Sequence, residues 1–261
     1  MAHFLGQRPQ YAVLRHESEH EQPTKPAEGA QEGERAEAIT GMEAYHRGMA
    51  RMRSAAGDAW ILACGAPMLP SVGYADSFRT GSDIAFESDP DPKQGFYRWQ
   101  ARATAARAWT HGRWWWIDPD QLVIREPLDE AQVRGALVSG VVAGGTWLLG
   151  DDLVALDEER LALALDPELT SFLGGQAVPT DPLLAVSVLD GGPIVEASLV
   201  DDVVPTHWVL EDGTVALLNL GEGSVEVEGP GGVELFTGET ADAGTRTLAP
   251  GDGELWRPEG R

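Results

Sequence analysis

The sequence is poor in cysteine and has no long apolar segment. Cys64 is the single cysteine in 261 residues, which excludes a disulfide within the chain and favours a reducing compartment. No run reaches the roughly 18 apolar residues that a membrane-spanning helix needs. The first residues, "MAHFLGQRPQ", also lack the charged start and apolar centre of a secretion signal. The sequence therefore predicts a soluble, cytoplasmic protein.

Positive charge is also scarce. The 19 lysines and arginines stand against 42 acidic residues, which gives a net charge of −23. Such a surface repels the phosphates of nucleic acids and of anionic lipids, so we expect neither as a partner. With 43% hydrophobic residues, the chain still has enough apolar side chains to bury a core.

The texture of the sequence changes twice and predicts three parts. Residues 1–39 include the glutamate-rich stretch 16–38, which has almost no large apolar side chain and predicts a disordered acidic insertion. Residues 40–174 alternate short apolar runs with helical patterns, which is typical of parallel β/α units. Residues 175–261 contain short alternating runs separated by turn signals such as "EDGT" and "PGG", which predict an antiparallel β-sandwich.

Within the middle part the pattern predicts four strands and four helices. The first helix begins after Thr40, a favourable N-cap, and places Tyr45, Met49 and Met52 on one face. The other predicted elements are the strands 59–63, 74–79, 114–117 and 146–149 and the helices 93–111, 128–143 and 152–165.

One short motif is typical of zinc proteases. "HESEH" at residues 16–20 matches H-E-x-x-H, in which two histidines hold the metal and the glutamate acts as a base. That chemistry needs a well-packed helix, whereas here Pro23 and Pro26 follow at once and the surroundings are solvated glutamates. The sequence therefore argues against a metal site, and it predicts no cofactor.

Polar side chains stand at the carboxyl ends of the four predicted strands. They are Cys64, then Arg79 and Asp83, then Asp118 and Asp120, and finally Asp151 and Asp152. In a parallel β/α barrel, functional side chains gather at this end of the strands. Each carboxylate alone also fits a helix cap or a partner for an arginine, which is how we interpret Asp151 and Asp152.

Three stretches in series resemble the α-galactosidases of glycoside hydrolase family 36, the melibiase type. They are "ILACGAPMLPSVGYADSFRTGSDIA", "WWIDPDQLVI" and "GGTWLLGDDLVALDEERLALAL". The resemblance covers about residues 40–170, and "VALLNL" and "ELFTGE" are similar to the family's C-terminal domain. It implies the C-terminal half of a (β/α)8 TIM barrel, strands 5–8, followed by a β-sandwich.

The resemblance also implies site residues. The acid/base of the family's R-x-G-x-D motif corresponds to Asp83, and Arg79 would bind sugar hydroxyls and hold the carboxylates. Cys64 and Gly65 match substrate-binding positions, with Cys64 beside the sugar 2-hydroxyl. Asp118 matches the family's D-P-D sequence as a further substrate-binding residue.

The match departs from the family pattern in two places. Ile117 stands where the family has asparagine. The family's nucleophile, an aspartate in a K-x-D strand, has no counterpart, because no aspartate precedes Asp58. Half a barrel also leaves two unpaired strand edges, so we expect self-association or a partner chain that completes the barrel.

Three functions stay open at this point. The chain resembles part of a retaining α-galactosidase that acts on an α-galactoside or a related sugar. Alternatively it is an inactive remnant or a sugar-binding module, or, on the "HESEH" motif alone, a zinc hydrolase. The tryptophans 114–116 and 147 fit either a sugar pocket or helix packing.

Overall fold

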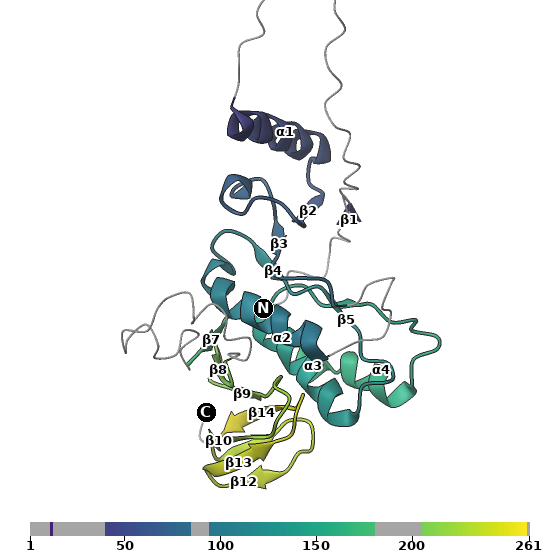
Figure 1. Ribbon diagram of the computed structural model, residues 1–261, viewed down its shortest axis with the longest axis vertical. Helices are drawn as coiled ribbons and strands as arrows, with labels where there is room; N and C mark the ends of the chain where they lie inside the picture. The colour runs from purple at the N-terminus through teal and green to yellow at the C-terminus, as the bar shows by residue number, and fades with distance from the viewer. Residues whose placement is uncertain (1–10, 13–39, 85–93, 181–204, 260–261) are drawn as a thin grey trace, which may run out of the picture. The chain divides into compact units, whose positions relative to one another are not determined.

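The computed structural model describes residues 11–12, 40–84, 94–180 and 205–259 (Figure 1). The chain divides into two compact units, residues 1–78 and 79–261. The "HESEH" motif lies outside the described residues, and the predicted boundaries after residues 39 and 174 stay predictions. No helix in the described ranges is both long and apolar enough to cross a membrane.

The first unit contains parallel strands and one long helix. Strand β2 pairs in parallel with β1 on one side, Tyr11 opposite Trp60, and with β3 on the other, Leu62 opposite Ser77. The elements are β1 (Tyr11–Ala12), α1 (Gly41–Ala56), β2 (Trp60–Ala63), a short 3-10 helix (Leu69–Ser71) and β3 (Ser77–Arg79). The strands predicted at 59–63 and 74–79 are therefore present, the second only in its last three residues.

Helix α1 begins where the sequence predicts. The side chain of Thr40 accepts a hydrogen bond of 3.2 Å from the amide of Glu43, which supplies an acceptor that the first helical turn lacks. The helix ends at Ala56 and is followed by Gly57, whose φ of +56° is accessible to glycine at little cost. On the predicted face Met49 is buried, whereas Met52 is 39% exposed.

The first part of the second unit alternates helices with short strands. Its elements are α2 (Gln94–Arg107), a 3-10 helix (Ala108–Thr110), β4 (Trp116–Asp118), β5 (Gln121–Leu122), α3 (Glu130–Ala143), β6 (Leu148–Leu149), α4 (Glu158–Ala164) and α5 (Pro167–Thr170). Strands β5 and β6 pair in parallel. The predicted helices 93–111 and 128–143 correspond to α2 and α3, and the predicted strands 114–117 and 146–149 overlap β4 and β6, whereas β5 was not predicted.

The helix predicted at 152–165 is wrong in its first half. Residues 152–157 form turns, and α4 begins only after Asp157, whose side chain accepts hydrogen bonds from the amides of Glu159 and Arg160. Asp151 is not a helix cap either: it accepts a 2.7 Å hydrogen bond from the amide of Ile124 and pairs with Arg125. The buried carboxylate of Asp151 therefore links the loop after β6 to the loop after β5, whereas the sequence predicted that it caps a helix.

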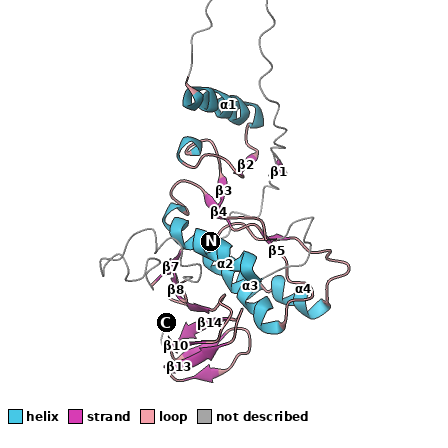
Figure 2. Cartoon of the chain, viewed as in Figure 1, coloured by secondary structure: helices cyan, strands magenta, loops and turns pink. Residues whose placement is uncertain are grey.

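After α5 all described elements are strands (Figure 2). They are β7 (Ala177–Pro179), β8 (His207–Leu210), β9 (Val215–Leu218), β10 (Val225–Gly229), β11 (Gly232–Glu234), β12 (Thr240–Ala241), β13 (Gly244–Leu248) and β14 (Gly253–Pro258). Six form an antiparallel sheet in the order β12-β11-β14-β9-β8-β7, and β10 pairs with β13. A small apolar cluster that includes Leu217, Leu248 and Trp256 joins the two sheets. The predicted antiparallel β region is confirmed.

Helix α3 joins the helical part of this unit to the sheet. It is buried almost all round, because it packs against α2 and against β14 and β9. A Cβ atom on Gly135 would lie 1.9 Å from the carbonyl oxygen of Gly251, and one on Gly253 would lie 2.9 Å from Val138. Helix and sheet therefore approach more closely than any side chain at Gly135 would allow.

Candidate functional site

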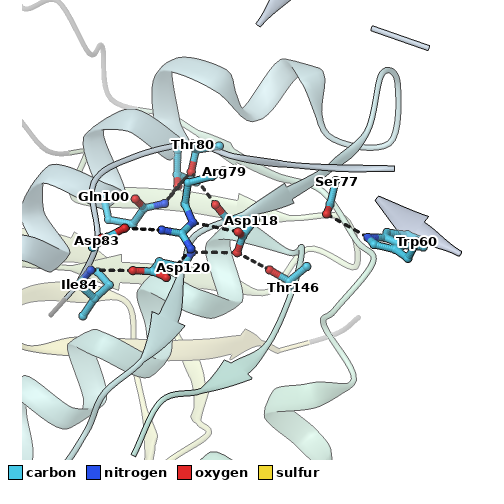
Figure 3. Close-up of polar contacts among 11 residues, drawn as sticks. Trp60, Ser77, Arg79, Thr80, Asp83, Ile84, Gln100, Asp118, Asp120 and Thr146 are labelled. Atoms are coloured by element: carbon cyan, nitrogen blue, oxygen red, sulfur yellow. Dashed lines mark hydrogen bonds and ion pairs between the residues drawn. The ribbon is translucent and has the colours of Figure 1, made fainter. Parts of the chain in front are cut away.

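A single guanidinium holds three carboxylates where β3 and β4 end (Figure 3). Arg79 donates from Nε to Asp118 at 2.9 Å, from Nη1 to Asp83 at 2.8 Å, and pairs through Nη2 with Asp120 at 2.6 Å. The side chains of Asp118 and Asp120 are 0% and 8% exposed, whereas Asp83 is 55% exposed. The arrangement therefore buries two carboxylates beneath the arginine and presents the third to solvent.

Asp118 is fixed by more than the arginine. Its Oδ1 accepts hydrogen bonds from the hydroxyl of Thr146 at 2.7 Å and from the amide of Asp120 at 3.0 Å. Its backbone oxygen accepts from the amide of Thr80, the residue after the arginine. Thr146 reaches this place because Gly145 lies against β4: a Cβ there would be 1.6 Å from the oxygen of Ile117. These donors offset the cost of burying the charge of Asp118, so the carboxylate is a structural part of the site.

Asp120 contacts two segments at once. Its Oδ1 pairs with Arg79, and its Oδ2 accepts a 2.7 Å hydrogen bond from the amide of Ile84. Its φ of +75° is uncommon for any residue other than glycine, although aspartate tolerates it better than most. Burial raises the pKa of Asp120, and the nearby charge of Arg79 acts in the opposite direction.

A buried polar layer supports the turn between Arg79 and Asp83. Gln100 donates from Nε2 to the hydroxyl of Thr80 at 2.6 Å, and Arg107 donates to the carbonyl oxygen of Thr80 at 2.9 Å. A Cβ atom on Gly81 would lie 2.1 Å from Oε1 of Gln100. The glycine of the R-x-G-x-D sequence therefore leaves room for the side chain of Gln100, on helix α2, beside this turn.

The structure brings together three of the five predicted site residues. Arg79, Asp83 and Asp118 form one network, as the sequence predicted for Arg79 and the carboxylates. Cys64 and Gly65 follow β2 in the first compact unit, where both are exposed. Their assignment to the substrate, and the sugar-binding role of Asp118, stay predictions.

The aromatic residues divide between the two interpretations. Trp147 packs against the main core, and its indole N–H donates to the carbonyl oxygen of Ala164. Trp115 is 4% exposed and donates to Thr110. Both therefore serve helix packing. Trp116, at the start of β4, is 39% exposed and lies at the opposite end of this strand from Asp118.

Sequence reasoning missed the supporting residues. Asp120 was recognised as polar at a strand end but received no role, and Thr146 and Gln100 were not considered. The D-x-D spacing of residues 118 and 120 was the available signal, because a turn can direct both side chains to one arginine. No group of histidine, cysteine or acidic side chains with metal-site geometry occurs among the described residues.

Comparisons with known proteins agree with this architecture. No family model matches the chain. The fold is similar to β-L-arabinopyranosidase from Geobacillus stearothermophilus, at 13% identity and a TM-score of 0.60, over 83% of this chain and 55% of that one. It is also similar to α-galactosidase I from Mortierella vinacea, at 12% identity and a TM-score of 0.56, over 82% of this chain and 62% of that one.

A third solved structure extends the range of activities that share the fold. An isomaltodextranase from Arthrobacter globiformis T6, complexed with panose, matches at 16% identity and a TM-score of 0.55, over 84% of this chain and 41% of that one. The chain thus has the fold of glycoside hydrolases of the α-galactosidase type, and it spans about half the length of the solved structures that it matches.

Proposed function

We propose that the chain is part of an α-galactosidase-like retaining glycoside hydrolase of the cytoplasm, with Asp83 as its acid/base. The observation that carries the proposal is the Arg79–Asp83 pair: a carboxylate that is 55% exposed is held by an arginine that is itself fixed from below by two buried carboxylates. This arrangement presents one polar pair to a ligand while the rest of the network stays dry. It fits the assignment that the family resemblance implies.

In this proposal Asp83 transfers a proton twice. It first gives a proton to the departing glycosidic oxygen, and it then takes one from the water that cleaves the covalent intermediate. A second carboxylate must attack the anomeric carbon from about 5–5.5 Å away. We place that nucleophile on the K-x-D strand of the first barrel half, supplied by a partner chain or by another segment of the protein, while residues 40–174 form strands 5–8.

Two of the solved structures with this fold, together with the family resemblance, motivate the choice of substrate, although the isomaltodextranase shows that the fold also serves other sugars. α-D-Galactosides and β-L-arabinopyranosides share the configuration of the ring hydroxyls and differ in the hydroxymethyl group at C5. Both activities occur among proteins that share this fold. We therefore propose a sugar of this configuration as the substrate, with Arg79 donating to its hydroxyls.

The decisive experiment supplies the missing half. The 261-residue chain alone should turn over an activated aryl α-galactoside at the background rate, because no covalent intermediate can form without a nucleophile. With a chain that carries the K-x-D strand, hydrolysis should appear. Robust hydrolysis by the isolated chain would show that another carboxylate attacks and would overturn the assignment.

Substitution of Asp83 then tests the acid/base role. In the completed enzyme, Asp83→Asn should abolish hydrolysis of substrates with poor leaving groups, because nothing protonates the departing oxygen. Cleavage of the first bond in an activated aryl glycoside should slow far less. Asp152→Asn, at an exposed turn, is the matched control and should leave both rates unchanged. Equal losses on both substrates would assign the proton donor to another residue.

A sugar-binding module without catalysis is the alternative. An exposed carboxylate beside a rigidly held arginine also suits the binding of sugar hydroxyls without catalysis. Titration of the isolated chain with galactose or L-arabinose, followed by calorimetry, distinguishes the two. Saturable binding that Arg79→Ala removes, together with no hydrolysis after the missing half is supplied, would select the binding module.

A further inference from the structure

We propose that Asp120 is the positioning residue of the site, which holds Arg79 and the backbone beside Asp83 in one arrangement. The effect of Asp120 on catalysis rests on the proposed function, whereas its contacts with Arg79 and Ile84 are independent of that function. Asp120 touches neither Asp83 nor, in this proposal, the sugar. It acts through its neighbours.

The two oxygens of Asp120 bind two different segments (Figure 3). Oδ1 pairs with Nη2 of Arg79 at 2.6 Å, and Oδ2 accepts the amide N–H of Ile84 at 2.7 Å. Ile84 directly follows Asp83 and its side chain is 1% exposed. One carboxylate therefore fixes the arginine that pairs with Asp83 and also the peptide that carries Asp83.

The exposure of Asp83 explains why this support matters. A side chain that is 55% exposed is held weakly by a surface ion pair alone, because water competes for both partners. The side chain of Asp118 fixes Nε of Arg79, but its remaining partners, Thr146 and the amide of Asp120, belong to other segments. The backbone oxygen of Asp118 holds Thr80, at the start of the turn and three residues before Asp83. Among the hydrogen bonds described here, the one to Ile84 links the buried network to the chain at Asp83.

Few residue types satisfy this position. The φ of +75° at Asp120 disfavours most side chains and excludes β-branched ones, while glycine, asparagine and aspartate adopt it most readily. Aspartate alone among these offers two acceptor oxygens on a short side chain. Asparagine keeps one acceptor and glycine keeps none. Asp120→Asn and Asp120→Gly therefore separate the two contacts without adding backbone strain.

Nuclear magnetic resonance on the full chain tests the proposal without any need for activity. In the wild-type protein, the Ile84 amide proton and the Nη2 protons of Arg79, which face the two oxygens of Asp120, should both exchange slowly with solvent. Asp120→Gly should accelerate exchange at both by about tenfold or more, since loss of a buried hydrogen bond opens both sites. Asp120→Asn should keep the Ile84 amide protected and accelerate only the Arg79 signal. Asp152→Gly, which removes an exposed turn acceptor, should change neither.

Unchanged protection of Ile84 and Arg79 in both Asp120 variants would overturn the proposal. If Asp120→Gly does not fold, Asp120→Asn decides: a changed Arg79 signal in an otherwise native spectrum supports the proposal, and an unchanged one refutes it. In the completed enzyme kcat should fall in the order wild type, Asp120→Asn, Asp120→Gly, so the conservative variant partly rescues the rate. If exchange behaves as expected while no chain hydrolyses any glycoside, the proposed function fails and the positioning role of Asp120 stands.

Discussion

The same arginine offers an internal comparison between a buried and an exposed ion pair. Asp118 and Asp83 both contact Arg79 at 2.8–2.9 Å, but their side chains are 0% and 55% exposed. Removing an exposed partner changes the free energy of unfolding by about 0–1 kcal/mol. Removing a buried partner costs about 3–5 kcal/mol, because the other charge stays uncompensated in a dry environment.

For Asp118→Ala we expect the free energy of unfolding to fall by about 3 kcal/mol, the lower end of this range, because Asp120 and Asp83 still hold the guanidinium. Part of this loss comes from the hydroxyl of Thr146 and the amide of Asp120, which are left without the buried acceptor. Asp83→Ala should cost less than about 1 kcal/mol. The distances to Arg79 are alike in the two pairs, so the difference comes from the burial of Asp118 and from the buried donors that it satisfies.

Urea unfolding followed by tryptophan fluorescence measures both values. All tryptophans except Trp60 lie in residues 79–261, so the signal reports the unit that contains the network. With a slope of about 1–3 kcal/mol per molar urea, Asp118→Ala should lower the midpoint by about 1–3 M. Equal midpoints for the two variants would refute the reasoning, because they would show that Asp118 is not buried as described.

Two further predictions concern packing and pH. Gly145→Ala should destabilise the chain by about 1–3 kcal/mol in urea unfolding, because its Cβ would lie 1.6 Å from the oxygen of Ile117. Gly223→Ala is the control and should be near neutral, because a Cβ there has no neighbour within 4 Å. Equal effects of the two substitutions would contradict the close approach at Gly145. Burial, together with the charges of Glu234 and Asp252, raises the pKa of Glu254, against the effects of its hydrogen bond from Trp256 and the charge of Arg246. The protonated carboxyl of Glu254 therefore binds its proton more tightly in the folded state than in the unfolded state. The resulting contribution to the free energy of unfolding is complete at acid pH and is lost as pH rises through the raised pKa. Unfolding free energies measured from about pH 4 to 7 should therefore fall for wild type relative to Glu254→Gln, and a constant difference would refute the shift.

Periodicity located most elements because the side chains that form the core repeat with the period of each element. Helix α3 was predictable from its apolar residues and from Asp129, which forms a capping box with Gln132. The start of α4 was not, since Asp151 and Asp152 look like caps as much as Asp157 does. What separates them is tertiary: Asp151 is satisfied by Ile124 and Arg125, residues far away in the sequence.

The site divides in the same way. The contact between Arg79 and Asp83 was predictable from their spacing, because the turn that follows the strand brings a residue four positions later back beside the arginine. The role of Asp120 was hidden, because it depends on a backbone angle of +75° and on an amide 36 residues earlier in the chain. Residues whose function is to hold other residues leave little trace in a single sequence.

Ile117 shows how a departure from the family pattern is accommodated. The α-galactosidases that the sequence resembles have asparagine here, so the local hydrogen bonds of that family do not carry over directly. Ile117 is 1% exposed, and its backbone still donates to Nδ1 of His111 and accepts from Thr146. Burial lowers the pKa of His111, which keeps this nitrogen free to accept. Asp118, the next residue, takes its hydrogen bonds from Arg79, Thr146 and the amide of Asp120, so the network does not depend on the side chain at position 117.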